Sequence, residues 1–150
     1  MTDFARPRNM APGEGSEAAA PLRKVTLLQE TRGLDIAGVQ GHPLDQGVYW
    51  PLIARYVNGA EEFDVGIYRL DSDEFHPSHY HPAAAEFYYF IEGSCRVRVD
   101  DDWIEATPGT AIYLPAGTVH AVRTRPGETT TMVYGFSCGD FRDAGTTWVE

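Results

Sequence analysis

Two histidines that are separated by one residue, His79 and His81, constrain the fold of this chain more than any other feature. Side chains alternate between the two faces of an extended strand, so imidazoles at positions i and i+2 share a face only if this segment is extended. The carboxylate of Glu86 can return to the same face from a following strand. Residues 109–120 contain a short apolar strand, a Pro/Gly turn and a second strand that delivers His120. The sequence therefore predicts β-structure that brings three imidazoles and one carboxylate to one point.

This set of side chains has the chemistry of a metal site. Imidazoles with one carboxylate suit first-row divalent ions, namely Fe, Mn, Ni, Co, Cu or Zn. We expect one divalent transition-metal ion, bound by His79, His81, Glu86 and His120. Four protein ligands would complete a tetrahedral zinc site, whereas a six-coordinate ion would keep two positions for water, substrate or dioxygen. A single histidine is more often a hydrogen-bonded core residue than a ligand, but three histidines with a glutamate favour a metal.

The two segments resemble the motifs of the cupin family, which read G-x5-H-x-H-x(3,4)-E-x6-G and G-x5-P-x-G-x2-H-x3-N. The matching residues are His79, His81, Glu86, Gly93, Gly109, Pro115, Gly117 and His120. Asp73 stands where the first motif opens with Gly, and Thr124 stands where the second closes with Asn. Both departures fall on turn or support positions, so the ligand set is complete. The resemblance covers residues 63–138 and implies an all-β fold, the cupin jelly-roll barrel or double-stranded β-helix, with a bound metal.

The length of 150 residues is that of one domain. Residues 1–21 are rich in Gly, Pro, Ala and charge and lack apolar periodicity, so we expect a disordered N-terminal tail. Residues 22–150 are predicted to form a single cupin domain. Met1 and Met10 are both possible start positions.

Many short apolar segments at spacings of about eight to twelve residues predict an all-β barrel or jelly roll. Before the first motif we expect strands at 24–30, 35–39 and 63–70 and a polar loop at 71–78. Residues 49–58, which contain Pro51, fit either an edge strand or a short helix. After the first motif we expect a hairpin of 95–100 and 103–106, strands at 111–114, 118–123 and 129–137, and a last segment, 141–150, that packs on the barrel.

Residues 86–91 are apolar on both faces of the predicted strand. Phe87, Tyr89 and Ile91 lie on the face opposite Glu86. In a strand with one solvated face, polar residues should occupy that face and alternate with the apolar ones. We therefore expect the N-terminal strands or a partner subunit to cover this outer face, and we predict a homodimer.

Composition excludes several classes of partner. The net charge of −10, from 12 basic and 22 acidic residues, argues against a nucleic-acid partner, which requires a basic face. No apolar run of about eighteen residues is present, so we expect no membrane span. The N-terminus has no signal-peptide pattern, and we expect a cytoplasmic protein with Cys95 and Cys138 as free thiols.

Tyr88 is the candidate catalytic residue, because it follows Glu86 by two residues on the same strand face. A nearby divalent cation stabilises a phenolate, which allows general acid/base chemistry. The alternative is an aromatic residue that only lines the barrel. For substrate binding, Arg98 could hold a carboxylate, and His76 is expected at the mouth of the barrel. The full set of substrate-binding candidates is Tyr113, Tyr134, His76, Phe90 and Arg98.

Three functions are compatible with this sequence. The first is a metal-dependent enzyme with non-redox lyase or isomerase chemistry on a small polar or carboxylated metabolite, in which the metal is a Lewis acid and Tyr88 the acid/base. The Glu86-x-Tyr88 pair resembles small cupin lyases that cleave dimethylsulfoniopropionate. The second is an Fe(II)-dependent dioxygenase with the same ligands, and the third is a non-catalytic cupin that binds a small ligand. The fold alone does not separate them.

Overall fold

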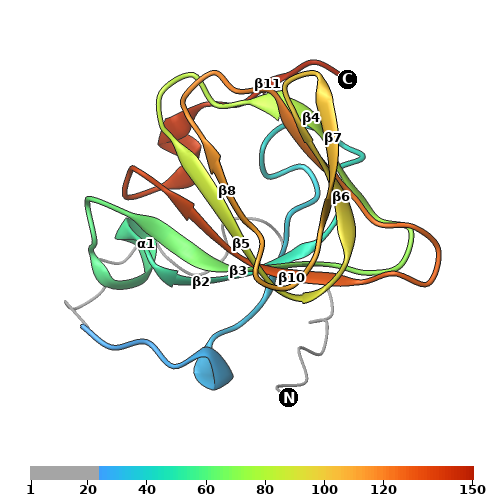
Figure 1. The fold of residues 1–150 in the computed structure, drawn as a ribbon. Helices are drawn as coiled ribbons and strands as arrows, with labels where there is room; N and C mark the ends of the chain where they lie inside the picture. Colours follow the sequence, from blue (N-terminus) through green and yellow to red (C-terminus); the bar gives the residue numbers. More distant parts are fainter. Residues whose placement is uncertain (1–23) are drawn as a thin grey trace.

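The computed structural model describes residues 24–150, so the predicted tail at 1–21 lies outside the described residues. Two antiparallel sheets face each other and enclose the interior (Figure 1). The first has the strand order β1-β2-β3-β10-β5-β8, and the second has the order β11-β4-β9-β6-β7. The prediction of an all-β jelly roll is confirmed.

The strands are short, and residues 24–150 also contain turns and three short helices. The first sheet contains β1 (Leu34–Asp35), β2 (Val48–Ile53), β3 (Asp64–Leu70), β5 (Glu86–Gly93), β8 (Ala111–Leu114) and β10 (Thr130–Phe136). The second contains β4 (Phe75–Tyr80), β6 (Cys95–Val99), β7 (Asp102–Ala106), β9 (His120–Arg123) and β11 (Thr147–Trp148). The helices are η1 (Leu28–Glu30), α1 (Arg55–Asn58) and η2 (Phe141–Ala144). The strands expected near 63–70, 95–106, 111–114 and 129–137 are therefore confirmed.

The strand expected at 24–30 is wrong, because this segment turns into the 3₁₀ helix η1. The hydroxyl of Thr31 donates to the backbone oxygen of Leu27, 2.9 Å away, and the N–H of Thr31 donates to Leu28. Such local bonds compete with pairing in a sheet. The strand expected at 35–39 is also wrong, since β1 ends at Asp35 and a turn follows.

For residues 49–58 the sequence left open an edge strand or a short helix, and the structure contains both, β2 followed by α1. β2 pairs with β3 on one side, while β1 reaches only Val48 and Tyr49 on the other. Pro51 therefore has no partner strand on its second side, where its missing N–H would have been needed. The helix α1 follows and ends at Gly59, whose φ of 76° lies in the left-handed region.

The polar loop expected at 71–78 ends earlier than predicted, because β4 begins at Phe75. The register of β4 against β9 shifts between His76 and His79. A bulge of this kind places two residues that are three positions apart on the same face. Both imidazoles are buried, with 5% and 0% of their surface exposed.

The two departures from the family motifs meet in one turn. Asp73 has a φ of 64°, a left-handed conformation that Gly adopts readily and Asp tolerates. The hydroxyl oxygen of Thr124 lies 2.7 Å from the backbone oxygen of Asp71 and 2.8 Å from that of Glu74. Thr124 thus fastens the turn that leads into β4.

The core lies between the sheets and includes the fully buried side chains of Leu70, Phe90, Leu114 and Met132. The last segment packs on the barrel as predicted: β11 pairs with β4, and Trp148 lies opposite His79. None of the helices in residues 24–150 has the length and hydropathy that a membrane crossing requires.

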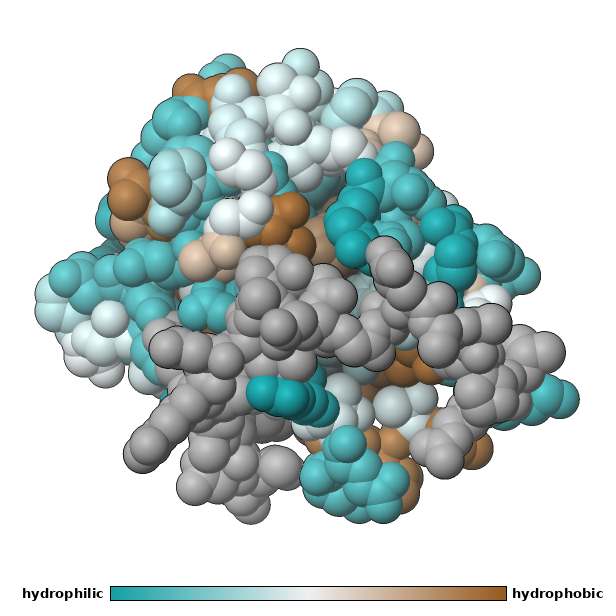
Figure 2. Space-filling view, turned by 180° about the vertical axis from the view of Figure 1, so that it is seen from behind, coloured by the Kyte–Doolittle hydropathy of each residue, from teal (hydrophilic) through white to brown (hydrophobic). Residues whose placement is uncertain are grey.

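The outer face of β5 is not covered by the described N-terminal segments, and that part of the prediction is wrong. Phe87, Tyr89 and Ile91 keep 42%, 44% and 41% of their surface exposed. Cover by a partner subunit stays a prediction. On the face of the molecule shown in Figure 2, hydrophobic residues form separate spots on a largely hydrophilic or neutral surface.

Candidate metal centre

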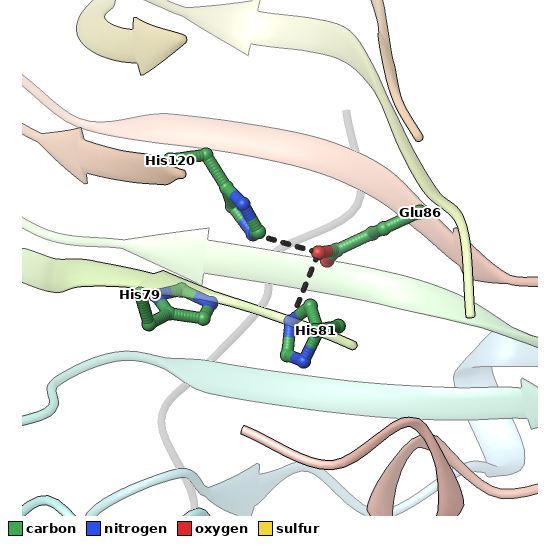
Figure 3. Close-up of side chains that lie close together, drawn as sticks. All are labelled: His79, His81, Glu86 and His120. Atoms are coloured by element: carbon green, nitrogen blue, oxygen red, sulfur yellow. Dashed lines mark ion pairs between the residues drawn. The ribbon is translucent and has the colours of Figure 1, made fainter. Parts of the chain in front are cut away.

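The predicted ligands converge between the two sheets. His79 near the end of β4 lies directly opposite His120, the first residue of β9. His81 follows β4, and Glu86 is the first residue of β5 on the other sheet. One potential ligand atom from each of the four residues lies within 4.8 Å of all the others, and all four residues are buried. Figure 3 shows Glu86 pointing at the histidines from the opposite side.

Each imidazole is oriented by a backbone carbonyl group. A carbonyl oxygen only accepts, so each Nδ1 carries the proton and donates it, which leaves the lone pair on Nε2. The three bonds run from His79 to Pro77, from His81 to Gly145 and from His120 to Thr118, over 2.6, 2.6 and 2.8 Å. This arrangement of supporting bonds is typical of histidines that bind metals.

The inward-facing atoms are all acceptors when the imidazoles are neutral and the carboxyl is ionised. Oε2 of Glu86 lies 3.2 Å from Nε2 of His81 and 2.8 Å from Nε2 of His120 (Figure 3). Within the described part of the chain, Oε2 and the three Nε2 atoms are buried and make no hydrogen bond. Buried acceptors without donors are rare, and a cation is the group that would satisfy them. The donor set therefore fits a divalent transition-metal ion.

Burial and mutual charge set the protonation of the ligands. Burial lowers the pKa of His79 well below its ordinary value, and His76, His120 and His81 add to this effect. Burial raises the pKa of Glu86, but the imidazoles of His120 and His81 outweigh it and hold the pKa below its ordinary value. At His81 burial lowers the pKa, yet Glu86 outweighs burial and the pKa is raised. A metal therefore competes with a proton at His81.

Tyr88 lies beside the ligands with 1% of its surface exposed. Its ring centre is 6.0 Å from that of His120, and its hydroxyl has no hydrogen-bond partner in the described residues. Burial, followed by the charge of Glu86, raises the pKa of Tyr88 well above its ordinary value. A cation bound to Glu86 would lower the pKa of Tyr88.

A cavity opens beside Glu86 and Tyr88. Its empty space is about 350 Å³, including the part that is open to solvent. Its walls are mostly aromatic, and none of the described residues that line it is Lys or Arg. The lining residues are Ile36, Gln40, Tyr49, Tyr68, His76, Glu86, Tyr88, Tyr134, Phe136 and Phe141.

Two of the predicted substrate-binding residues line this cavity. The hydroxyl of Tyr134 lies 3.4 Å from Oδ1 of the buried Asp64. His76 lies on β4 and is buried, rather than in a loop at the barrel mouth. Their role in substrate binding stays a prediction.

Three of the predicted substrate-binding residues lie elsewhere. Tyr113 is 70% exposed on the outer face, because Ile112 and Leu114 occupy the inward positions of β8. Phe90 belongs to the core and does not line the cavity. The guanidinium of Arg98 donates to the backbone oxygen of Asp100 and to the hydroxyl of Ser78 instead of facing the cavity. The prediction that Phe90 and Tyr113 line the pocket beside the predicted metal ligands is wrong, whereas a role of Arg98 in binding a substrate carboxylate stays a prediction.

The sequence reasoning missed two polar residues from the segment before β2. Oδ1 of Asp45 lies 2.5 Å from Nδ1 of His76. Gln40 lines the cavity, and its backbone oxygen accepts a hydrogen bond from the indole N–H of Trp148. No local pattern could have found Asp45, because its partner lies 31 positions away in the chain.

Comparison with known proteins gives a family and a fold. Residues 66–135 match the family model described as Cupin domain. No functionally curated protein matches the sequence. Among solved structures, the chain is similar to the polyketide cyclase RemF from Streptomyces resistomycificus, with a TM-score of 0.70, 22% identity, and coverage of 85% of this chain and 86% of that chain.

Two further structures have the same architecture. A Klebsiella pneumoniae protein with a double-stranded β-helix domain gives a TM-score of 0.59 at 16% identity, over 69% of this chain and 84% of that chain. Oxalate decarboxylase from Bacillus subtilis gives a TM-score of 0.65 at 21% identity, over 92% of this chain. The match spans 35% of the decarboxylase. The family match shows that residues 66–135 are a cupin domain, and the structural likenesses show that the chain has the cupin jelly-roll fold.

Proposed function

We propose that this protein is a metal-dependent enzyme that catalyses a non-redox lyase or isomerase reaction on a small carbonyl- or carboxyl-bearing metabolite. One observation carries the proposal: three imidazole Nε2 atoms and one carboxylate oxygen converge, without hydrogen-bond donors, beside a cavity. A divalent ion held by His79, His81, Glu86 and His120 would supply a Lewis acid beside that cavity, which Glu86 lines.

The protein itself supplies a proton-carrying group next to this point. The hydroxyl of Tyr88 is buried and unpaired within the described residues, and Tyr88 lines the cavity with Glu86. Tyr88 can therefore hold a proton at its phenolic oxygen and pass it to or from the substrate. The aromatic walls, including Tyr134 and Phe136, keep water away and orient a flat molecule.

The structural neighbours support an enzymatic role by analogy. One is a polyketide cyclase, and another is an oxalate decarboxylase that has Mn(II) centres. Because their identity to this chain is 20–22%, the likeness concerns the fold, and the reaction has to be argued from the site.

Proton exchange tests the proposal. Protein loaded with Mn, Ni or Zn is incubated in D₂O under argon with simple ketones and 2-oxo acids, and NMR measures deuterium entering at carbon next to the carbonyl. We expect exchange with the wild type and a loss of about 100-fold or more in Tyr88→Phe at unchanged metal content. Tyr113→Phe, which alters an exposed phenol, is the matched control. Equal exchange by Tyr88→Phe would remove Tyr88 from the mechanism.

The aromatic cavity also favours a second candidate, an Fe(II)-dependent dioxygenase with the same ligands. Oxygen uptake that requires Fe(II) and an added aromatic compound, with no exchange under argon, would support this reaction over the first. Ligand binding with neither activity would leave a non-catalytic binding protein.

A further inference from the structure

Residues 145–150 lie beside β4 and form a segment that we call the strap (Figure 1). Within the strap, β11 pairs with β4 in a register that sets Trp148 opposite His79. Side chains that lie directly opposite each other in an antiparallel pair share a face of the sheet and interact. Trp148 is therefore the neighbour of a candidate metal ligand, although the two residues are far apart in the chain.

The indole of Trp148 is held in place and packs against His79. Its N–H donates to the backbone oxygen of Gln40, 2.8 Å away. Its ring centre lies 4.8 Å from that of His79, with an angle of 44° between the two planes. Because the indole fills the space on this side of the imidazole, it limits the rotation of the imidazole. The contact adds to the hydrogen bond from Nδ1 of His79 to the backbone oxygen of Pro77.

The strap also contacts the second histidine of the first motif. The backbone oxygen of Gly145 accepts a hydrogen bond from Nδ1 of His81, over 2.6 Å. His120 differs, because its Nδ1 donates to the backbone oxygen of Thr118 in its own segment. Two of the three imidazoles in the candidate metal centre therefore take part of their orientation from the strap.

Ser78 attaches the strap to β4 through both of its backbone groups. Its N–H donates to Oε2 of Glu150, and its backbone oxygen accepts from the N–H of Val149, each over 2.9 Å. The other carboxylate oxygen of Glu150 pairs with Arg123 on β9, and an ion pair that is partly exposed stabilises little. A two-residue strand with so few bonds should open more easily than the barrel. Docking of the strap is therefore an equilibrium that a second event can shift.

We propose that docking of the strap and metal binding strengthen each other, with Trp148 as the positioning residue for His79. A docked strap restricts His79 and His81, so less ordering remains to be done when the ion binds. By linkage, the factor by which docking raises the metal affinity equals the factor by which the metal favours docking. The inference rests on the proposed function in one respect, namely that the candidate metal centre binds a divalent ion.

Metal affinity in variants of Trp148 tests the positioning role. Titration of the full chain with Co(II) should show about tenfold weaker binding by Trp148→Leu, as for other residues that support metal ligands. The visible absorption of bound Co(II), which reports the arrangement of its ligands, should also change. Trp148→Phe keeps an aromatic ring beside His79 and should recover most of the affinity. Val149→Ala, at a half-exposed position of the same segment, is the control and should match the wild type.

A purely structural role for Trp148 would give a different result. Trp148→Leu would then lose the same free energy of unfolding in the metal-free and the metal-loaded protein, which urea denaturation measures in both forms. Its Co(II) affinity and absorption spectrum would equal those of the wild type. That result overturns the proposal.

Hydrogen exchange of the wild type measures the same coupling from the other side. The amide of Val149, which donates to Ser78, should exchange about tenfold more slowly when Zn(II) is bound. The amide of Gly109, in the turn between β7 and β8, is the control and should exchange at the same rate in both forms. Unchanged exchange at Val149, or equal slowing at both amides, overturns the proposal.

Metal content, measured on the same samples, separates this inference from the proposed function. Protein that binds no divalent metal contradicts the proposed function itself. Protein that binds the metal, but with equal affinity in the wild type and Trp148→Leu, contradicts only the role of the strap.

Discussion

Nε2 of His120 lies 2.8 Å from Oε2 of Glu86, although the two residues open strands in different sheets. His79 and His120 share one sheet, and Glu86 faces them from the other (Figure 3). The candidate metal centre therefore spans the two sheets. Loss of any ligand should affect metal binding more than it affects the fold, because each sheet keeps its own hydrogen-bonded ladder.

We expect His120→Ala to lower metal affinity by more than about 100-fold, since even supporting residues outside the ligand set contribute 10–100-fold. Elemental analysis of protein purified without chelators measures this directly. His42→Ala is the matched control, because His42 is also a histidine in contact with Trp148 but is not part of the cluster. Unchanged metal content in His120→Ala would refute the ligand assignment.

Asp64 should make stability depend on pH. Burial raises its pKa from 3.8 to about 7, although Phe141, Tyr56 and Tyr134 donate hydrogen bonds to it. The pKa of this carboxyl group is higher in the folded chain than in the unfolded chain. Its contribution to stability is therefore complete below the unfolded pKa and is lost as pH rises through the folded pKa. The loss between about pH 4 and 8 is at most about 4 kcal/mol.

Asp64→Asn removes this titrating group. Between about pH 4 and 8, the free energy of unfolding of the variant should therefore fall less than that of the wild type. Urea denaturation at several pH values measures the difference. Asp101→Asn, at an exposed position in the β6–β7 turn, should keep the wild-type profile. A parallel profile for Asp64→Asn and wild type would show that Asp64 keeps its charge throughout.

Thr124→Val should lower stability by about 0.5–1.5 kcal/mol, because it removes the hydroxyl that donates to the backbone oxygen of Asp71 or Glu74, while each of these oxygens still accepts from a backbone N–H. Thr124→Ser keeps the hydroxyl and should lose less. Chemical denaturation of both variants gives the comparison. If the two variants are equally stable, the hydroxyl does not hold this turn.

Two motif glycines should respond very differently to alanine. Gly93 and Gly109 both have positive φ, 74° and 92°, which costs about 1–2 kcal/mol for other residues. A Cβ at Gly93 would also overlap the backbone oxygen of Thr129, whereas a Cβ at Gly109 would meet nothing within 4 Å. We expect Gly93→Ala to lose about 3 kcal/mol or more and Gly109→Ala about 1 kcal/mol, measured by thermal or chemical unfolding. Equal losses would contradict the crowding at Gly93.

The sequence by itself predicted the jelly-roll class, through its resemblance to the cupin motifs, and the four side chains that converge at the candidate metal centre. Alternation along a strand is a local rule, and it places His79 and His81 together in any extended backbone. The turn glycines and the motif spacing then bring Glu86 and His120 to the same interior. A second local rule predicts the strands at 64–70 and 130–136: both segments are rich in β-branched and aromatic residues, which favour sheets.

Only the tertiary structure decided which other residues face the site. Tyr113 and Tyr134 both lie on strands, and their opposite orientations follow from the register that β5 imposes on its neighbours β8 and β10. The bulge that turns His76 inward depends on pairing with β9, and its contact with Asp45 joins residues 31 positions apart. Local periodicity contains no information about such register and loop closure, because both depend on packing between segments that are distant in the chain.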